Sequence, residues 1–277
     1  MNKLSRAARA QALQWLCKGT SIKATNRRTG LSMTALLRLV GDSGRAASWY
    51  QDRVFRHLNS KKIEINVLWG FKDRNVPGAK KGRVRPGNVW VWFATDPRTK
   101  LVPSWFLARQ DAASAVVIIN DVAARFSGRV QLSSYGQRLA LETVKAPLEA
   151  NIDYAIVARL YAENSKSEEP YRSALGIGGQ KRRIVGNPGA KPRSKASADG
   201  SSVTLEMRPP SSLPKASTFE KRLANHANAL ALHFLHYNFI RIHKGLRSTP
   251  AMAAGITSRR WKFNDIVDVL EAWEAAG

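Results

Sequence analysis

The sequence predicts an α/β protein that opens with a helix-turn-helix. Three observations support this fold class. The first 46 residues repeat apolar side chains at helical spacing, three segments after residue 60 are rich in Ile, Val, Trp and Phe, and strand-like and helix-like patterns then alternate. Alternating strands and helices indicate a mixed sheet flanked by helices.

The N-terminal domain, predicted over residues 1–46, consists of three short helices. Residues 5–17 repeat apolar side chains every three or four positions, and a glycine follows them. A second helix is predicted from Ser21, and Ser32 is expected to cap a third helix that runs to residue 41. The tight turn at Gly30 between the last two helices is typical of a helix-turn-helix.

Polar and basic side chains cover the outward side of this predicted motif. Thr34 and Arg38 lie on the outer face of the third helix, and the second helix carries Lys23, Arg27 and Arg28. This arrangement suits a recognition helix: the third helix would lie in a major groove of DNA, and the cations of the second helix would contact phosphates.

Residues 60–160 are predicted to form the first part of a core. The segments 61–71, 87–95 and 100–109 are separated by Gly, Pro and Asp turns and predict a three-stranded antiparallel meander. After it, the pattern predicts helices at 111–126 and 139–150 and strands at 129–134 and 151–161.

The rest of the chain divides into a loop and a set of helices. Residues 161–215 are rich in Gly, Pro, Ser and Lys, which predicts a long, flexible, basic loop. Residues 216–277 are predicted to complete the core with a helix at about 218–240, a short helix opened by Pro250 and an amphipathic helix at 266–273.

The charge balance points to a polyanionic partner. The chain has 45 Lys and Arg against 20 Asp and Glu, a formal net charge of +25. Such an excess favours duplex DNA, because bound cations release counterions from the phosphates. No apolar run is long enough for a membrane span, and no secretory signal opens the sequence, so we expect a cytoplasmic, nucleoid-associated protein in which Cys17 is a small buried side chain.

Several stretches together resemble the insertion-sequence-one family of bacterial transposases. The most specific are NHANALALHFLHYNFIRIHKGLRSTPAMAAG, NVWVWFATDPRTKLVPSW, and IDYAIVARLY followed by GNP. The resemblance covers nearly the whole chain. It implies a ribonuclease-H-like core in which two aspartates and a glutamate hold two divalent ions for DNA cleavage and strand transfer.

The resemblance also locates three family acids that this chain has replaced. Asn66 and Tyr135 occupy the positions of the two aspartates, and the glutamate position falls at Asp199. Neutral side chains cannot supply the charge that paired Mg²⁺ ions require. We therefore expect no intact catalytic site and no cofactor, and Mg²⁺ only if other acids substitute. The weak candidates for such a relocated metal site are Asp199, Glu64 and Asp96.

Two further groups of residues have both a structural and a functional interpretation. Histidines 226, 233, 236 and 243 near one helix are expected to serve packing and hydrogen bonding rather than metal binding. Arg241, His243, Lys244 and Arg247 form a basic cluster that would either grip phosphates or lie solvated at the surface.

Three functions remain open at this point. The leading one is a DNA-binding, non-cleaving transposase derivative that acts as a regulator or persists as a relic. The alternatives are an active transposase that uses relocated acids with a divalent metal, and a non-catalytic interaction subunit that docks through its C-terminal helix. The expected partners are duplex DNA, a second copy of the chain or an active transposase relative, and not a membrane.

Overall fold

The computed structural model describes residues 4–72, 88–135, 152–161, 176–185 and 219–277. The chain is of the mixed α/β class and divides into two compact units. The helical unit draws on Met1–Arg56, Arg98–Pro103 and Gly200–Gly277, and the sheet unit on His57–Pro97 and Ser104–Asp199. Each unit is described by itself below.

The helical unit begins with α1 (Arg6–Cys17), α2 (Ile22–Thr29) and α3 (Met33–Val54). The predicted starts of all three helices are confirmed. Ser5, Ser21 and Ser32 each stand at an N-cap, where the hydroxyl oxygen accepts a hydrogen bond from the backbone N–H three residues later at 3.2–3.3 Å. This bond satisfies a donor that has no partner inside the helix.

Helix α3 is longer than predicted, because it continues past residue 41 to Val54. The predicted end lies at Gly41, Gly44 follows it closely, and glycine is a poor helix former. Tertiary packing overrides that preference: Ala46 and Ala47 beyond the glycines are fully buried, and α3 packs against α6 (Phe219–Phe239) and α8 (Phe263–Ala276).

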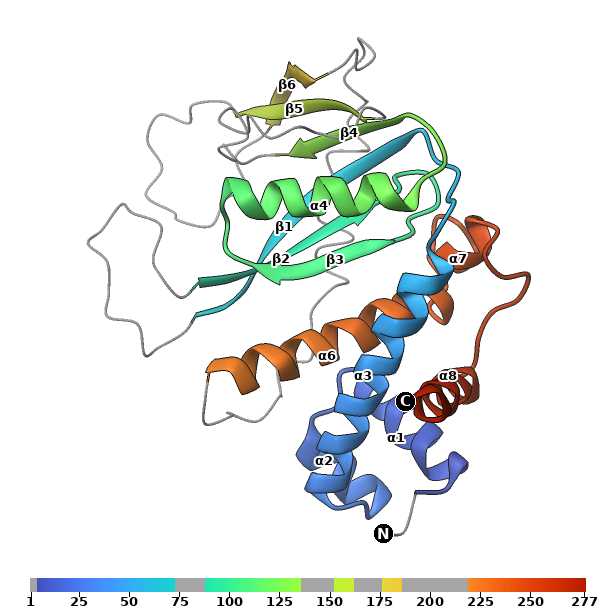
Figure 1. Cartoon of the computed structure of the whole chain (residues 1–277). Coiled ribbons are helices and arrows are strands. Elements are labelled where there is room, and N and C mark those ends of the chain that lie inside the picture. The colour runs from blue at the N-terminus through green and yellow to red at the C-terminus, as the bar shows by residue number, and fades with distance from the viewer. Residues whose placement is uncertain (1–3, 73–87, 136–151, 162–175, 186–218) are drawn as a thin grey trace. The chain divides into compact units, whose positions relative to one another are not determined.

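The predicted C-terminal helices are confirmed as α6, α7 (Pro250–Ala253) and α8. Figure 1 shows α6 crossing α3, and α8 beside α1, within this unit. On α8, Ile266, Val269 and Leu270 are buried, and the helix packs on α1 and α3. The apolar face of the C-terminal helix thus completes the core of the helical unit.

A short segment between two strands, Arg98–Pro103, belongs to the helical unit. The buried side-chain amide of Asn238 on α6 binds both backbone groups of Val102: its Oδ1 accepts from the N–H at 3.0 Å and its Nδ2 donates to the carbonyl at 2.9 Å. Gln51 of α3 donates to the Ala231 carbonyl of α6 at 3.2 Å. Amides with complete sets of partners therefore tie the segment and the two helices together.

The sheet unit contains one six-stranded sheet in the order β3-β2-β1-β4-β5-β6. The bounds of its strands are β1 Lys62–Lys72, β2 Asn88–Thr95, β3 Ser104–Ala108, β4 Val130–Tyr135, β5 Ile152–Tyr161 and β6 Gly176–Val185. The predicted meander is confirmed, since β1, β2 and β3 pair antiparallel. β1 pairs parallel with β4 and β4 with β5, whereas β6 is antiparallel to β5.

Helix α4 (Ala112–Arg125) covers one face of this sheet (Figure 1). The helix begins where it was predicted, and Asp111 caps it, with Oδ1 accepting from the Ser114 N–H at 2.9 Å. Ile118, Ile119 and Val122 of α4 form a buried cluster with apolar side chains of β1, β2 and β4. Ile63 and Ile65 point into this cluster, so the alternate residues Glu64 and Asn66 lie on the other face of the sheet.

Strand β6 corrects the prediction of an unbroken loop over residues 161–215. Its sequence, GIGGQKRRIV, has no alternation of apolar and polar residues and therefore gave no strand signal. This segment is a strand because its backbone pairs with the edge of β5, and such pairing cannot be recognised from the side-chain pattern. The rest of that segment, and the helix predicted at 139–150, lie outside the described residues.

Candidate functional site

The connection between α2 and α3 is a short, internally bonded turn. Helix α2 ends at Thr29, and Gly30 caps it with a φ of +70°, which glycine adopts at little cost. The N–H of Gly30 donates to the Asn26 carbonyl at 2.9 Å. The Asn26 side-chain amide donates to the Leu31 carbonyl at 2.7 Å. These bonds fix the direction in which α3 leaves α2.

The predicted DNA-contacting side chains of these helices are accessible. Lys23, Arg27, Thr34 and Arg38 are all exposed. Arg28 is also exposed, but its guanidinium carbon lies 4.3 Å from the ring centroid of Trp15, where it covers the indole face. The structure therefore brings the predicted cations to the surface on both sides of the turn.

Met33, at the first position of α3, was not among the predicted contact residues. Its side chain is 38% exposed, unusual for a large apolar residue on the described surface. The signal was available in the sequence, because a side chain directly after the N-cap Ser32 cannot yet lie against the preceding turn of its own helix. An exposed thioether next to Thr34 could contact thymine methyl groups.

Arg38 shares an acidic partner with a neighbour on α3. Its Nε lies 3.7 Å from Asp42 Oδ2, and Arg45 donates to Asp42 Oδ1 at 2.5 Å. One carboxylate therefore serves two guanidinium groups, which leaves net positive charge on this side of the helix. Because the Arg38 side chain is 63% exposed, a phosphate can reach it.

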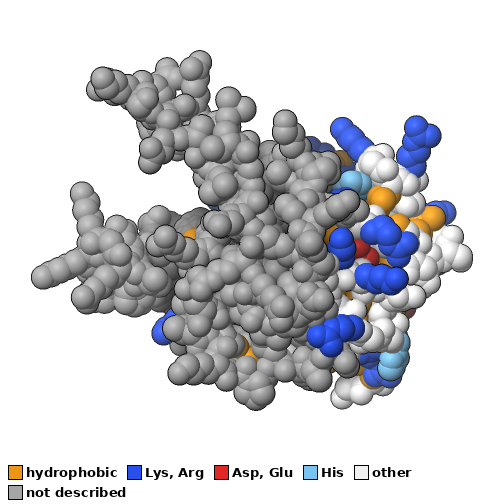
Figure 2. Space-filling model, turned by 90° about the horizontal axis from the view of Figure 1, so that it is seen from above, with side chains coloured by type: hydrophobic (Ala, Val, Ile, Leu, Met, Phe, Trp, Pro, Cys, Tyr) orange, Lys and Arg blue, Asp and Glu red, His pale blue; other side chains and the backbone are white. Residues whose placement is uncertain are grey.

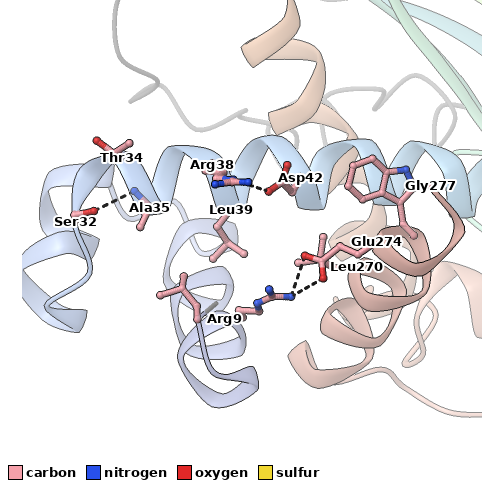
Figure 3. Close-up of a pocket in the computed structure, with 12 residues that line it drawn as sticks. Arg9, Ser32, Thr34, Ala35, Arg38, Leu39, Asp42, Leu270, Glu274 and Gly277 are labelled. Carbon is pink, nitrogen blue, oxygen red and sulfur yellow. Dashed lines mark hydrogen bonds and ion pairs between the residues drawn. The ribbon is translucent and has the colours of Figure 1, made fainter. Parts of the chain in front are cut away.

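A pocket of about 880 Å³ lies between the start of α3 and the end of α8 (Figure 3). Thr34, Arg38 and Asp42 line it from α3, and Leu270 and Glu274 from α8. On the α8 side, the nearly buried Arg9 of α1 pairs with Glu274 at 3.2 Å. Thr34 and Arg38, the predicted contact residues on α3, therefore line a pocket whose α8 side contains the ion-paired Glu274.

The predicted basic cluster after α6 is spread along a folded loop. The His243 N–H donates to the Ser248 carbonyl at 3.0 Å, and the His243 carbonyl accepts from the Arg247 N–H at 2.9 Å. Lys244 and Arg247 are exposed, whereas Arg241 and His243 are half-buried. Only part of this cluster is therefore presented to a partner.

The histidines of α6 are held neutral by their surroundings. Burial lowers the pKa of His226, His233 and His236 to about 4, with neighbouring positive charges contributing a smaller part of the shift for the last two. Among the residues that the structure describes, no three His, Cys, Asp or Glu side chains form a group that could hold a metal ion. Burial likewise raises the pKa of the half-buried Cys17 thiol to about 12.

The three positions at which the sequence resemblance predicted the family's acids fall on two strands and a segment outside the described residues. Asn66 is half-buried on β1, opposite Phe93 of β2, and its Nδ2 donates to the Glu64 carbonyl at 3.3 Å. Tyr135 ends β4, one residue beyond the Ile65–Ser134 pair of β1 and β4. The backbones at positions 66 and 135 are therefore neighbours, while Asp199 lies outside the described residues.

Glu64 and Asp96, two of the three acids considered as substitute metal ligands, lie at the same end of the β1–β2 pair. Glu64, half-buried on β1, pairs in register with Thr95 of β2, and Asp96 directly follows Thr95. Asp96 is only 4% exposed. Two carboxylate-bearing residues are thus close along the backbone, and the third candidate, Asp199, is not described.

Comparison with known proteins identifies no family. No family description and no curated protein matches the sequence. Among solved structures, the chain is similar to a Mos1 transposase paired-end complex with the left transposon end, at 14% identity and a TM-score of 0.20, and to a Mos1 strand transfer complex, at 13% and 0.18. The matches cover 52% and 50% of this chain and 56% and 53% of the Mos1 chains. At these scores the likeness carries no argument about fold or function.

The surface itself agrees with the excess of positive charge. Figure 2 shows one face on which, over the described part, Lys and Arg side chains are numerous and acidic side chains form one small area. No helix among the described residues is both long and apolar enough to cross a lipid bilayer.

Proposed function

We propose that the protein binds duplex DNA through α2 and α3, used as a helix-turn-helix, and that it does not cut the DNA. The observation that carries the proposal is the accessible set Lys23, Arg27, Thr34 and Arg38 on the two sides of the turn at Gly30. Helix α3 would enter the major groove with Thr34 and Met33 near base edges, while Lys23 and Arg27 would contact phosphates.

The sheet unit is proposed to be a ribonuclease-H-like core. Two features favour this reading: the order β3-β2-β1-β4-β5, and the fact that β2 alone runs against the other four of these strands. A mixed sheet of this kind agrees with the ribonuclease-H-like core that the sequence resemblance implies. The sixth strand, β6, would then be an addition at the β5 edge.

Loss of the acids supports binding without cleavage. In the proposed core, the neighbouring backbone positions 66 and 135 would carry the two aspartates, and here they are Asn66 and Tyr135. An amide and a phenol supply no negative charge at neutral pH, so two Mg²⁺ ions would lack their bridging ligands. The protein would act as a regulator that occupies transposon-end-like DNA, or persist as a relic.

Gel-shift and nicking assays on the same DNA test both halves of the proposal. Duplexes that carry candidate terminal repeats should be bound and should remain intact with Mg²⁺ or Mn²⁺ present. The K23A/R27A double variant should bind at least tenfold more weakly, since two phosphate contacts are lost. Arg56→Ala is the matched control, because the exposed Arg56 already pairs with Asp52 at 2.6 Å.

Metal-dependent nicking by the wild-type protein would contradict the non-cleaving half and favour the relocated acids, since Glu64 lies opposite the residue that precedes Asp96. The combined variant Asn66→Asp, Tyr135→Asp, Asp199→Glu should gain measurable metal binding if the proposed core is correct. The third function, docking through the C-terminal helix, is disfavoured because the apolar face of α8 is already buried.

A further inference from the structure

The pocket between α3 and α8 contains a nearly buried cation that the proposed DNA contacts do not use. Arg9 of α1 lines this pocket, and only 7% of its side chain is exposed. Both carboxylate oxygens of Glu274 on α8 contact the same nitrogen of Arg9, Nη1, at 3.2 and 3.4 Å. A guanidinium has N–H donors on all three of its nitrogens, so the Nε and Nη2 donors remain for a second acceptor.

Contacts between three helices form this pocket (Figure 3). The pair of Arg9 and Glu274 joins α1 to α8. The guanidinium carbon of Arg45 on α3 lies 5.5 Å from the ring centroid of Trp273 on α8, which joins α3 to α8. Leu270 of α8, another lining residue, is fully buried in the packed unit. The pocket is therefore a feature of the folded helices and needs no ligand to create it.

The lining fits an apolar molecule that carries one negative charge. Leu39, Leu270 and the indole of Trp273 supply apolar surface, and the volume of about 880 Å³ is that of a site for an organic ligand. A guanidinium binds a carboxylate through parallel N–H bonds, which Arg9 can offer beside its contact with Glu274.

A positively charged ligand fits the pocket less well. Both acids of the lining already have guanidinium partners, since Glu274 pairs with Arg9 and Asp42 pairs with Arg38 and Arg45. A ligand cation would have to displace one of these arginines, whereas a carboxylate would add a bond to Arg9.

The same pocket includes side chains of the proposed DNA-binding surface. Thr34 and Arg38 line it, and the Arg38 side chain is 63% exposed. A carboxylate bound in this pocket would place a negative charge beside the face of α3 that is proposed to meet DNA. Because this charge repels phosphates, a bound ligand would oppose DNA binding.

We propose that the pocket between α3 and α8 binds an aromatic carboxylate, with the carboxylate on Arg9 and the ring against the apolar lining, and that this ligand weakens DNA binding. The second half rests on the proposed function, whereas ligand binding can be measured without DNA. Because coupling between two binding sites is reciprocal, DNA would weaken ligand binding by the same factor.

The probe for the pocket is cinnamate, compared with the neutral cinnamamide and the cationic cinnamylamine. Ligand-observed NMR with the full chain measures the affinity of each compound. Cinnamate should bind about tenfold more tightly than cinnamamide, because only the carboxylate forms a charge-assisted bond with Arg9.

A double variant tests the assignment to Arg9. R9M/E274Q removes both charges, so it leaves no unpaired charge in the fold, and it should bind cinnamate no better than cinnamamide. R6M/E271Q is the matched control, since Arg6 and Glu271 form an ion pair between the same two helices and do not line the pocket. It should keep the wild-type preference, and thermal unfolding confirms that both variants are folded.

Fluorescence anisotropy with a labelled duplex tests the effect on DNA. Saturating cinnamate should weaken DNA binding by the wild type about fivefold, within the usual range of coupling between sites. Cinnamamide should have no effect on the wild type, and cinnamate should have none on R9M/E274Q. This comparison separates the pocket from general competition by an anion for a basic protein.

Each other outcome contradicts a stated part of the proposal. Equal binding of cinnamate and cinnamamide, tighter binding of cinnamylamine, or no binding of any of them overturns the pocket and leaves the proposed function intact. A carboxylate preference that persists in R9M/E274Q overturns the role of Arg9. Cinnamate binding with unchanged DNA affinity overturns the coupling. Failure of the wild type to bind any DNA, with cinnamate still bound, overturns the proposed function but supports the ligand site.

Discussion

Gly44 of α3 leaves no room for a side chain where the helix passes α6. A methyl group built on Gly44 would lie 2.4 Å from the Asn228 carbonyl oxygen and 2.5 Å from its Cα, both backbone atoms that cannot move alone. The glycine that weakens the local helix signal is therefore required by the packing of two helices. This explains why propensity predicted an early end to α3.

We expect Gly44→Ala to lower the free energy of unfolding by about 2 kcal/mol or more, since overpacking outweighs the gain in helix propensity. Gly41→Ala is a matched control three residues earlier. Its methyl group would lie 3.6 Å from the flexible Arg45 guanidinium and 4.0 Å from the Asn228 side-chain amide, both ordinary contact distances, so that variant should be neutral or slightly more stable. Urea denaturation measures both, and equal stabilities of the two variants would show that α3 and α6 do not approach closely.

The α6 histidines should make the protein less stable in mild acid. Their pKa values in the folded protein are about 4, below the ordinary 6.5, so the unfolded chain binds more protons between these two values. Stability is therefore full above about pH 6.5 and falls as the pH drops toward 4. From pH 7 to 5 the loss should be on the order of 1–2 kcal/mol for each histidine.

Urea denaturation at pH 7, 6 and 5 checks this expectation. Most carboxylates stay ionised over that range, so the histidines dominate the change. Replacement of the most buried of them, His233→Gln, should reduce the dependence on pH even if it lowers stability overall. A flat profile in the wild type would mean that these rings are solvated or already charged.

At the scale of elements, Asn238 joins α6 to a segment that leaves the sheet. Its amide satisfies both backbone groups of Val102, which are buried. Asn238→Ala should cost about 2–4 kcal/mol, because two backbone groups would lose their partners away from water. Asn264→Ala, at an exposed position of α8, is the control and should change stability little. Thermal unfolding compares them, and equal melting temperatures would contradict the role of Asn238.

The sequence predicted most helices and strands because their signals are local. Apolar spacing marked α1, serines marked the starts of α2 and α3, and partial apolar alternation marked the meander. Strand β6 escaped because its pairing with β5, rather than its composition, makes it a strand. The length of α3 escaped because it depends on α6 and α8, which follow it by more than 160 residues.

The candidate site was predictable to the same limited extent. Outward cations on α2 and α3 follow from helical periodicity, so Lys23, Arg27 and Arg38 could be named from the sequence.

At the scale of the whole molecule, the net charge of +25 sets how DNA binding responds to salt. If about 6 phosphates are neutralised, the affinity for a duplex should fall about a thousandfold between 50 and 200 mM salt. Fluorescence anisotropy with a labelled duplex measures this dependence, and Lys23→Ala should reduce its slope by about 1. A change of less than tenfold over this range would show that the excess charge serves something other than DNA.

The packing of α8 on α1 also determines when the newly synthesised chain can complete its helical unit. Arg6 of α1 binds Asp268 and Glu271 of α8, partners that follow it by 262 and 265 residues. At ribosomal speeds of about 5–20 residues per second, α1 waits on the order of tens of seconds for its partner. Until α8 emerges from the ribosome, the apolar residues of α1 that pack on α8 stay exposed unless another protein, such as a chaperone, binds them. Interrupted translation would then release a chain that carries α2 and α3 without the support that positions them.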